Sequence, residues 1–157
     1  MIAPEQLMQL AIEKAQAGIA AGQTPFGCAI VIEDDIIAVA HNTVWSTTDI
    51  TAHAEITAIR EACRRVADVH LSGAMVATTC EPCPMCMAAL HWSRAAKVYY
   101  GASIDDAARA GFNELALPAA ELLKRGGSHV ELVPGVLRDE CRELFELWRA
   151  AAKSREY

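Results

Sequence analysis

The pattern of apolar residues changes from segment to segment along this chain. In some segments they recur at helical spacing, and in others they form short continuous runs. The first set recurs every three or four residues, as on one face of a helix; its members are Met8, Ile12, Ala15 and Ile19. A proline at position 4 suits the first turn of such a helix. Two apolar runs follow, Cys28–Ile32 and Ile36–Ala40, separated by three acidic residues. The pattern therefore predicts an N-terminal helix and then a β-hairpin.

The middle of the chain predicts two helices with a strand between them. After His53, apolar residues again recur at helical spacing; they are Ile56, Ile59, Ala62, Cys63 and Val66. A second apolar block, residues 85–90, follows Pro82 and Pro84, which mark a helix start. The segment Ala74–Thr79 between the two blocks has the composition of a strand. A helix–strand–helix passage of this kind can bring two helix starts together.

The last third continues the alternation. Val98–Tyr100 and His129–Val133 predict a fourth and a fifth strand, with a short helix around Asp105–Ala110 and a loop between them. A final helix is expected from about Leu137, with an apolar stripe made of Leu137, Cys141, Leu144, Phe145 and Trp148. Strands and helices that alternate in this way predict an α/β fold, a three-layer α/β/α domain with a five-stranded mixed sheet over residues 1–157.

Composition narrows the partners that the domain is expected to have. Hydrophobic residues make up 53% of the chain, which is high for a soluble monomer and favours a homodimer with a shared apolar interface. The net charge of −6 makes a nucleic-acid partner unlikely, although a local basic patch can hide in an acidic total. No apolar run reaches the length of a membrane span. Six cysteines without a signal peptide favour a reduced, cytoplasmic chain.

The candidate chemistry lies at the starts of the two middle helices. His53, Cys83 and Cys86 form a three-ligand set typical of zinc, and a catalytic zinc site leaves its fourth position to water. Helix starts favour the anionic thiolates that zinc needs. Glu55 follows the histidine by two residues and is chemically suited to handling the protons of that water. On an ideal helix it would point away from His53, so we expect His53 to precede regular helical geometry.

Two other interpretations of this site have to be considered. A closed, structural zinc site, as in a non-catalytic zinc-binding scaffold, needs a fourth protein ligand and leaves Glu55 without a role. Cys80 is the rival ligand, because it forms an overlapping C-x-x-C unit with Cys83. It ends a predicted strand, and Glu81-Pro82 keeps it off the helix face, so we expect Cys80 to be a small buried residue.

These residues and this order of elements resemble the cytidine deaminase-like superfamily over nearly the whole chain. Residues 51–55 and 80–86 are similar to the branch that holds bacterial guanine deaminases and tRNA adenosine deaminases. Ala110-Gly111-Phe112, His91-Trp92 and the C-terminal residues 153–157 resemble the guanine deaminases. The segment Gly135–Cys141 is instead similar to the last helix of the tRNA deaminases.

The resemblance implies roles for individual residues. His53, Cys83 and Cys86 would bind Zn²⁺, and Glu55 would shuttle protons. The residues implied to contact the substrate are Phe26, Asn42, Ala54, Trp92 and Tyr157. Glu114 stands where many guanine deaminases have an aspartate; its carboxylate would accept from N–H groups of the base and assist departure of the amine. The tail 149–157 would reach across a homodimer to cap the partner's site.

The predicted activity is hydrolytic deamination of a free purine, guanine to xanthine and ammonia. The alternatives are adenosine in tRNA, or another amino-heterocycle such as a nucleoside or a triazine. Several of the substrate contacts also have ordinary structural explanations. Phe26 and Trp92 could belong to the core, although pockets favour aromatic residues. Asn42 could cap a turn, and Glu114 could be a solvated surface group.

Overall fold

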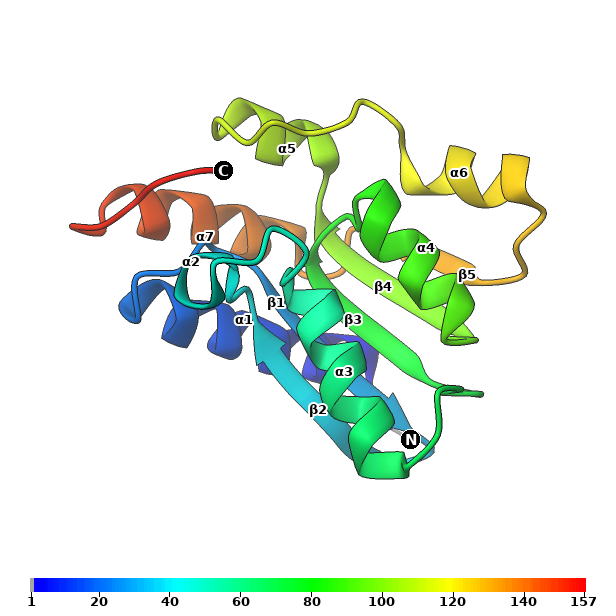
Figure 1. Ribbon diagram of the computed structural model, residues 1–157. Helices are drawn as coiled ribbons and strands as arrows, with labels where there is room; N and C mark the ends of the chain where they lie inside the picture. The colour runs from blue at the N-terminus through cyan, green and yellow to red at the C-terminus, as the bar shows by residue number, and fades with distance from the viewer. Residues whose placement is uncertain (1) are drawn as a thin grey trace.

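The computed structural model describes residues 2–157, and its centre is a five-stranded sheet (Figure 1). The strands are β1 (Gly27–Ile32), β2 (Asp35–His41), β3 (Met75–Cys80), β4 (Lys97–Ala102) and β5 (Glu131–Pro134). Their spatial order is β2-β1-β3-β4-β5. β1 pairs antiparallel with both β2 and β3, whereas β3, β4 and β5 run parallel. The predicted mixed sheet of five strands is confirmed.

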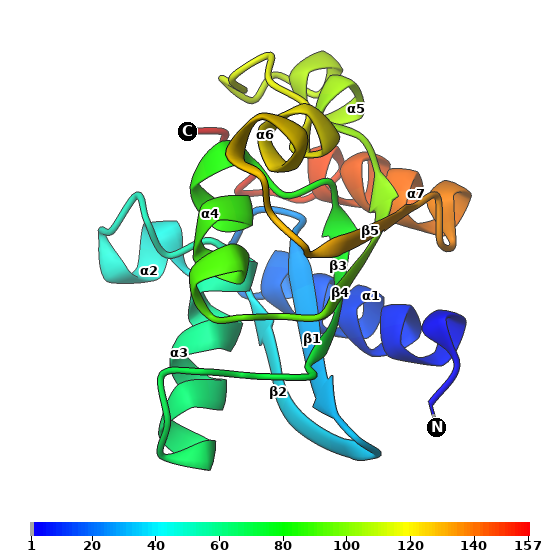
Figure 2. The same cartoon turned by 90° about the vertical axis from the view of Figure 1, so that its right-hand side faces the viewer.

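Helices cover both faces of this sheet, as Figure 2 shows from the side. One face carries α1 (Pro4–Ala20) and α7 (Arg138–Arg149), and the other carries α3 (Ala54–Val66), α4 (Pro84–Trp92) and α6 (Ala119–Gly126). The short helices α2 (Val44–Thr47) and α5 (Ile104–Arg109) follow the ends of β2 and β4. The three-layer α/β/α architecture is therefore confirmed. Within residues 2–157, no helix combines the length and the apolar character needed to cross a membrane.

Two hydrophobic cores lie between the layers, because successive strand residues face opposite sides of the sheet. On β3, Ala77 packs toward α1 and α7, whereas its neighbour Val76 packs toward α3 and α4. The α7 side of the sheet is closely approached at Gly101 of β4: a side chain there would collide with Cys141 of α7. A glycine at this position therefore lets α7 lie directly on the sheet.

The structure corrects two details of the sequence-based expectation. The buried face of α3 is formed by small residues and Glu55, namely Ala54, Glu55, Ala58 and Ala62, while Ile56, Ile59, Cys63 and Val66 are only half-buried. Alanines let α3 approach the sheet closely, so the larger residues pack at its flanks. The loop expected before β5 contains the helix α6, whose buried residues are only Ala119 and Leu123. So short an apolar pattern gives little periodicity in the sequence.

Candidate active site

The starts of α3 and α4 bring the three candidate zinc ligands together. His53 and Cys83 each precede the first residue of a helix and have nearly the same extended backbone conformation, with φ and ψ of −61° and 161° for His53 and −62° and 165° for Cys83. Cys86 follows inside the first turn of α4. The expectation that His53 lies outside regular helical geometry is confirmed. That conformation allows His53 and Glu55 to face the same site.

The distances between these side chains fit a zinc ion. Nδ1 of His53 lies 3.5 Å from Sγ of Cys86 and 3.7 Å from Sγ of Cys83, and all the ligand atoms lie within 4.8 Å of one another. Tetrahedral zinc with ordinary Zn–N and Zn–S bond lengths places such atoms about 3.6 Å apart. Two thiols and one imidazole supply three ligands of the kind zinc prefers, so a fourth coordination position is left for water.

The protonation states of the three ligand side chains favour the binding of a cation. A hydrogen bond from the Cys86 thiol lowers the pKa of Cys83 to about 4, while the same bond, together with burial, raises the pKa of Cys86 well above its usual value. Burial opposes a charged imidazole, but the Cys83 thiolate and the Glu55 carboxylate outweigh it and raise the pKa of His53. Because metal ligands must be deprotonated, zinc binding would release the proton held by Cys86.

Glu55 lies beside the ligands and is almost fully buried, with 6% of its surface exposed. The hydroxyl of Thr78, on β3, donates a hydrogen bond of 3.0 Å to Oε1 of Glu55. Burial, and then the negative charge of Cys83, raise the pKa of Glu55 above its usual value. A buried carboxyl held in one orientation and able to take up a proton is suited to proton transfer.

Two cavities meet at the ligands. The inner one, of about 20 Å³, is lined by Phe26, His53, Glu55, Cys80, Glu81, Cys83, Glu114 and Tyr157. The outer one, of about 260 Å³, shares four of these residues, namely His53, Cys83, Glu114 and Tyr157. The inner cavity has room for about one water molecule. A purine can therefore enter only if the residues between the two cavities move.

Most of the residues implied to bind substrate surround this point. Phe26 contacts Phe112 edge-on, with ring centroids 4.9 Å apart. Ala54 is buried and opens α3, so its N–H has no partner within the helix. Glu114 lines both cavities, and burial followed by the charge of Cys83 raises its pKa to about 7. The surroundings of Glu114 thus differ from those of a solvated surface carboxylate.

Asn42 connects the site to the C-terminal tail. Its side chain is fully buried; Oδ1 accepts from the N–H of Val44 at 3.0 Å, and Nδ2 donates to the Tyr157 hydroxyl at 2.6 Å. The ring of Tyr157 lies 5.5 Å from that of His53. The guanidinium of Arg155 lies 3.5 Å above the ring of Trp45. In this chain the tail therefore covers the chain's own site.

Trp92 lies away from the ligand cluster within one chain. It is the last residue of α4, at the opposite end of the helix from Cys83, and 79% of its surface is exposed. Its ring contacts only the neighbouring His91 among the ring pairs of residues 2–157. Within one chain Trp92 does not form a wall for the base. The reason is helix length: nine residues of α4 separate its two ends by roughly 13 Å.

Cys80 is buried, as expected, and lies outside the three-ligand cluster. Its thiol donates to the carbonyl of Ser103 at 3.4 Å, although it also borders the inner cavity. Thr78 and Trp45 also lie at the site, and neither was predicted from the sequence. A pair of threonines in the buried strand β3, two residues before Cys80, is the signal that could have indicated a polar role for Thr78. Nothing local in the sequence links Trp45 to Arg155.

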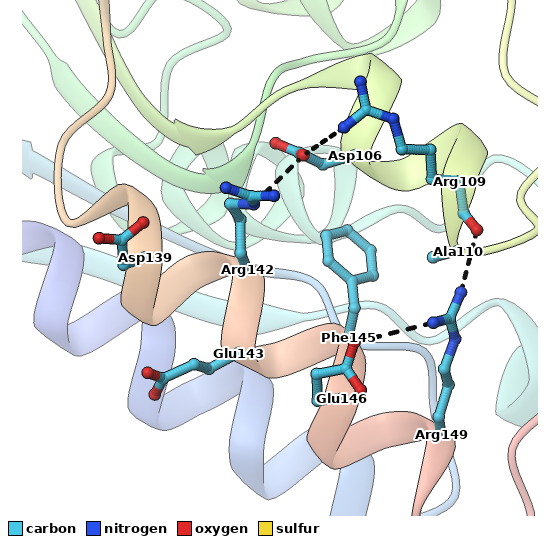
Figure 3. A pocket seen from close by; sticks show the side chains of 9 residues that line it. All are labelled: Asp106, Arg109, Ala110, Asp139, Arg142, Glu143, Phe145, Glu146 and Arg149. Carbon is cyan, nitrogen blue, oxygen red and sulfur yellow. Dashed lines mark hydrogen bonds and ion pairs between the residues drawn. The ribbon is translucent and has the colours of Figure 1, made fainter.

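A separate groove of about 430 Å³ runs between α5 and α7 (Figure 3). Its lining includes Arg109, Arg142 and Arg149, with acidic residues between them, and shares no residue with the two cavities at the ligands. Arg142 and Arg109 both pair with the carboxylate of Asp106, at 3.3 Å and 3.7 Å. Arginines and carboxylates thus neutralise one another in this groove, which holds no metal-ligand cluster.

Comparisons with known proteins agree with this geometry. Residues 1–102 match the family model of the cytidine and deoxycytidylate deaminase zinc-binding region. The chain is 39% identical over 153 residues to a guanine deaminase of Bacillus subtilis, covering 98% of this chain and 96% of that relative. It is 36% identical over 162 residues to a tRNA-specific adenosine deaminase of the same organism, covering 98% of each. The solved structure of guanine deaminase from Nitrosomonas europaea is similar with a TM-score of 0.88 at 30% identity, covering 96% of this chain and 87% of that one.

Proposed function

Because the chain belongs to the cytidine and deoxycytidylate deaminase zinc-binding family, we propose that it is a zinc-dependent deaminase that converts guanine to xanthine and ammonia. The observation that carries the proposal is the buried carboxyl of Glu55 beside the cluster of His53, Cys83 and Cys86. A structural zinc site has no use for such a group. Both a guanine deaminase and a tRNA-specific adenosine deaminase match over nearly the whole chain, and the higher identity of the former, 39% against 36%, favours guanine as the substrate.

The chain's own residues would move the protons. His53, Cys83 and Cys86 would hold the zinc, which when bound supplies an activated water at neutral pH. Glu55, oriented by Thr78, takes a proton from the attacking water and passes it to a ring nitrogen of the base. It then carries the second proton of that water to the departing amine, so guanine and water give xanthine and ammonia.

Three side chains would position the base. Asn42 offers the amide Nδ2 as a donor, once the Tyr157 hydroxyl leaves it. Phe26 presents a ring that borders the inner cavity, and Glu114 presents a carboxylate that can accept from N–H groups on the edge of the base. With its pKa near 7, Glu114 is also able to hold a proton close to the leaving amine.

The tail supports a free base rather than a polynucleotide as substrate. Tyr157 lies between the two cavities and bonds to Asn42, so the last residues of the chain cover the entrance. A small base can be enclosed by such a cover, whereas a nucleotide within an RNA needs an open path for its backbone. The net charge of −6 also disfavours a polyanion.

Adenosine in tRNA remains the second candidate, because a tRNA-specific adenosine deaminase matches 98% of this chain and Gly135–Cys141 resembles that group. An ammonia-release assay distinguishes the two. The zinc-loaded protein is tested on guanine, guanosine, adenine, ammeline and an adenosine-containing anticodon stem-loop, with zinc-loaded Glu55→Gln as the blank. We expect turnover of guanine. Salt-sensitive deamination of the RNA with guanine untouched would reverse the choice.

We also propose that the protein is a cytoplasmic homodimer whose tails are exchanged. Large apolar side chains are exposed around the site and on α4, including Ile50, Met85, Trp92 and Leu115, which favours a second chain as cover. All six cysteines are free, as in a reducing compartment. In an exchanged dimer, the segment after Ala150 would extend to the neighbouring chain. Tyr157 and Arg155 would then make there the contacts that they make here with Asn42 and Trp45 of their own chain.

Heterodimers test the exchange. One chain carries both Glu55→Gln and deletion of residues 155–157, and it is paired with a wild-type chain. If the tails are exchanged, the only site that still contains Glu55 faces the truncated tail, and activity falls well below half of that of the wild-type homodimer. If each tail serves its own chain, the wild-type site keeps working and half the activity remains. The second result would reject the exchange.

A further inference from the structure

The segment from Ile104 to Ala119 carries two of the residues that close the site, yet it has little regular structure of its own. α5 ends at Arg109, and the chain is irregular until α6 begins at Ala119. Phe112 and Glu114 lie in this irregular part. Its backbone bonds are short-ranged, such as Glu114 N–H to the Phe112 carbonyl at 2.9 Å and Leu117 N–H to the Leu115 carbonyl at 2.8 Å. Bonds of this kind fix the local shape of a loop but not its place over the site.

One carboxylate, that of Glu81, holds both ends of this segment. Oε2 of Glu81 accepts from the N–H of Ile104 at 3.0 Å, and Oε1 accepts from the N–H of Ala119 at 2.9 Å. These are the first residues of α5 and α6, so neither N–H has a partner inside its helix. A carboxylate has two oxygens and therefore can satisfy both donors at once with charge-assisted bonds.

Glu81 is itself fixed next to the metal ligands. It lies between β3 and α4, two residues before Cys83, and its own N–H donates to the Ala102 carbonyl at 2.7 Å. Its side chain also borders the inner cavity. The same short connection thus carries a zinc ligand and the group that holds the covering segment. A displacement of that segment relative to the metal requires the Glu81 bonds to break.

A second set of contacts holds the first end of the segment from the α7 side (Figure 3). Arg142 pairs with the buried carboxylate of Asp106 at 3.3 Å, and Arg149 donates to the Arg109 carbonyl at 3.0 Å. These contacts fix α5 on α7. They do not reach Ala119, where the bond from Glu81 is accompanied by the burial of Ala119 and Leu123 in the core.

We propose that Glu81 is a positioning residue that sets the place of Glu114 over the substrate. The inference rests on the proposed deamination for its kinetic consequence. Glu81 acts through the backbone of the segment, and both of its oxygens are occupied by N–H groups. It therefore needs no contact with the base.

The first test uses Glu81→Gln in the zinc-loaded protein. Glutamine retains one acceptor oxygen and turns the other into a donor that faces an N–H, so one of the two bonds is lost. We expect amide hydrogen exchange of Ala119 and residues 112–117 to rise by about tenfold, with zinc content unchanged. Asp68→Asn is the matched control, since Asp68 also accepts from a backbone N–H, that of His70, beyond the end of α3. Wild-type exchange in Glu81→Gln would overturn the proposal.

The second test is a double-mutant cycle with Glu114→Gln, measured on guanine. Glu81→Gln alone should lower kcat by roughly 10- to 100-fold with a smaller change in KM, because misplacing a catalytic group by about 1 Å has effects of this size. If Glu81 acts through Glu114, adding Glu81→Gln to Glu114→Gln should cost little more. Fully additive losses would reject that route. A wild-type protein inactive on guanine would reject the proposed function, while the exchange measurement would still decide the anchoring.

Discussion

The site consists of two halves that are held in different ways. The metal half, formed by His53, Glu55, Cys83 and Cys86, stands at the starts of α3 and α4, directly on the sheet. The covering half, formed by Phe112, Glu114 and Tyr157, stands on an irregular segment and on the C-terminal tail. Regular elements packed on a core hold side chains far more rigidly than loops and termini do.

This difference indicates a division of labour. The metal half is preformed: its atoms have the spacing of a zinc site, and Thr78 already orients Glu55. Preorganised charges of this kind lower the cost of the chemical step. The covering half leaves about 20 Å³ beside Glu55, so it has to open for substrate and close again for reaction. Changes to the metal half should therefore abolish chemistry, and changes to the cover should alter access and positioning.

The most severe change should be Cys83→Ser. Serine is a poor ligand for zinc, and Cys83 is the cysteine whose pKa is already lowered to about 4. We expect loss of zinc from the purified protein, loss of detectable turnover and a lower melting temperature. Metal analysis with a thermal melt provides the measurement. Retention of a full equivalent of zinc would show that the cluster is not the metal site.

Glu55→Gln should abolish turnover while leaving zinc and fold in place. Glutamine can still accept the hydrogen bond from Thr78, but it cannot take up a proton at the carboxyl. Loss of a positioned acid–base group costs about 10²- to 10⁴-fold in kcat. Zinc content, melting temperature and kcat are measured on the same preparation. A variant without zinc, or unfolded, would identify Glu55 as a structural residue.

The metal half was also the part that could be predicted from the sequence. The spacing of its residues at two helix starts determines how they lie, because residues close together in the sequence have few possible arrangements. These residues are His53, Glu55, Cys83 and Cys86. The sheet was predictable for the same reason, since each strand is a short apolar run between turn signals. The extended backbone of His53, inferred to let Glu55 face the same site, is present in the structure.

The covering half depends on contacts between residues far apart in the sequence. The bond between Asn42 and Tyr157 spans 115 residues, and that between Glu81 and Ala119 spans 38. The periodic pattern of apolar residues gives no information on contacts between residues so far apart. The role expected of Trp92 came from a resemblance of residue type, and its position at the end of α4 does not bring it to the site of its own chain. Thr78 was missed because a threonine in a buried strand usually signals only β-structure.

Thr78→Val should have an intermediate effect. Valine has nearly the same shape but no hydroxyl, so the 3.0 Å bond to the carboxylate of Glu55 is lost inside the protein. Hydrogen bonds to charged groups contribute about 1.5–3 kcal/mol, so we expect kcat to fall roughly 10- to 100-fold while zinc stays bound. Thr79→Val is less suited as a control, because Thr79 accepts from the N–H of Gly27. Thr57→Val is the better comparison, because Thr57 is half-buried on α3 and its hydroxyl has only a 3.5 Å contact with the Thr43 hydroxyl. Unchanged kcat in Thr78→Val would mean that Glu55 is oriented by other contacts.

Deletion of Arg155–Tyr157 tests the cover with a smaller expected effect. The deletion removes the bond between Tyr157 and Asn42 and the contact of Arg155 with Trp45. Water then reaches the base and the cover no longer closes, so we expect activity to fall by about tenfold with zinc content and melting temperature nearly unchanged. Steady-state kinetics with metal analysis checks this. Wild-type kinetics after deletion would assign the tail to an ordinary frayed terminus.

Cys80→Ser should have the smallest effect and marks the boundary between the two halves. Cys80 borders the inner cavity with Glu55 and Glu114, yet its thiol points its hydrogen at the Ser103 carbonyl, 3.4 Å away. Burial raises the pKa of this thiol well above its usual value, so it remains a neutral donor where Cys83 is a thiolate. A serine hydroxyl can make the same hydrogen bond in slightly less space. We therefore expect full zinc content, most of the activity and a stability change of about 1 kcal/mol or less. Zinc stoichiometry is the deciding measurement. If Cys80→Ser lost as much zinc as Cys83→Ser, Cys80 would belong to the ligand set. The zinc would then have four protein ligands and no open position for the water that the deaminase mechanism needs.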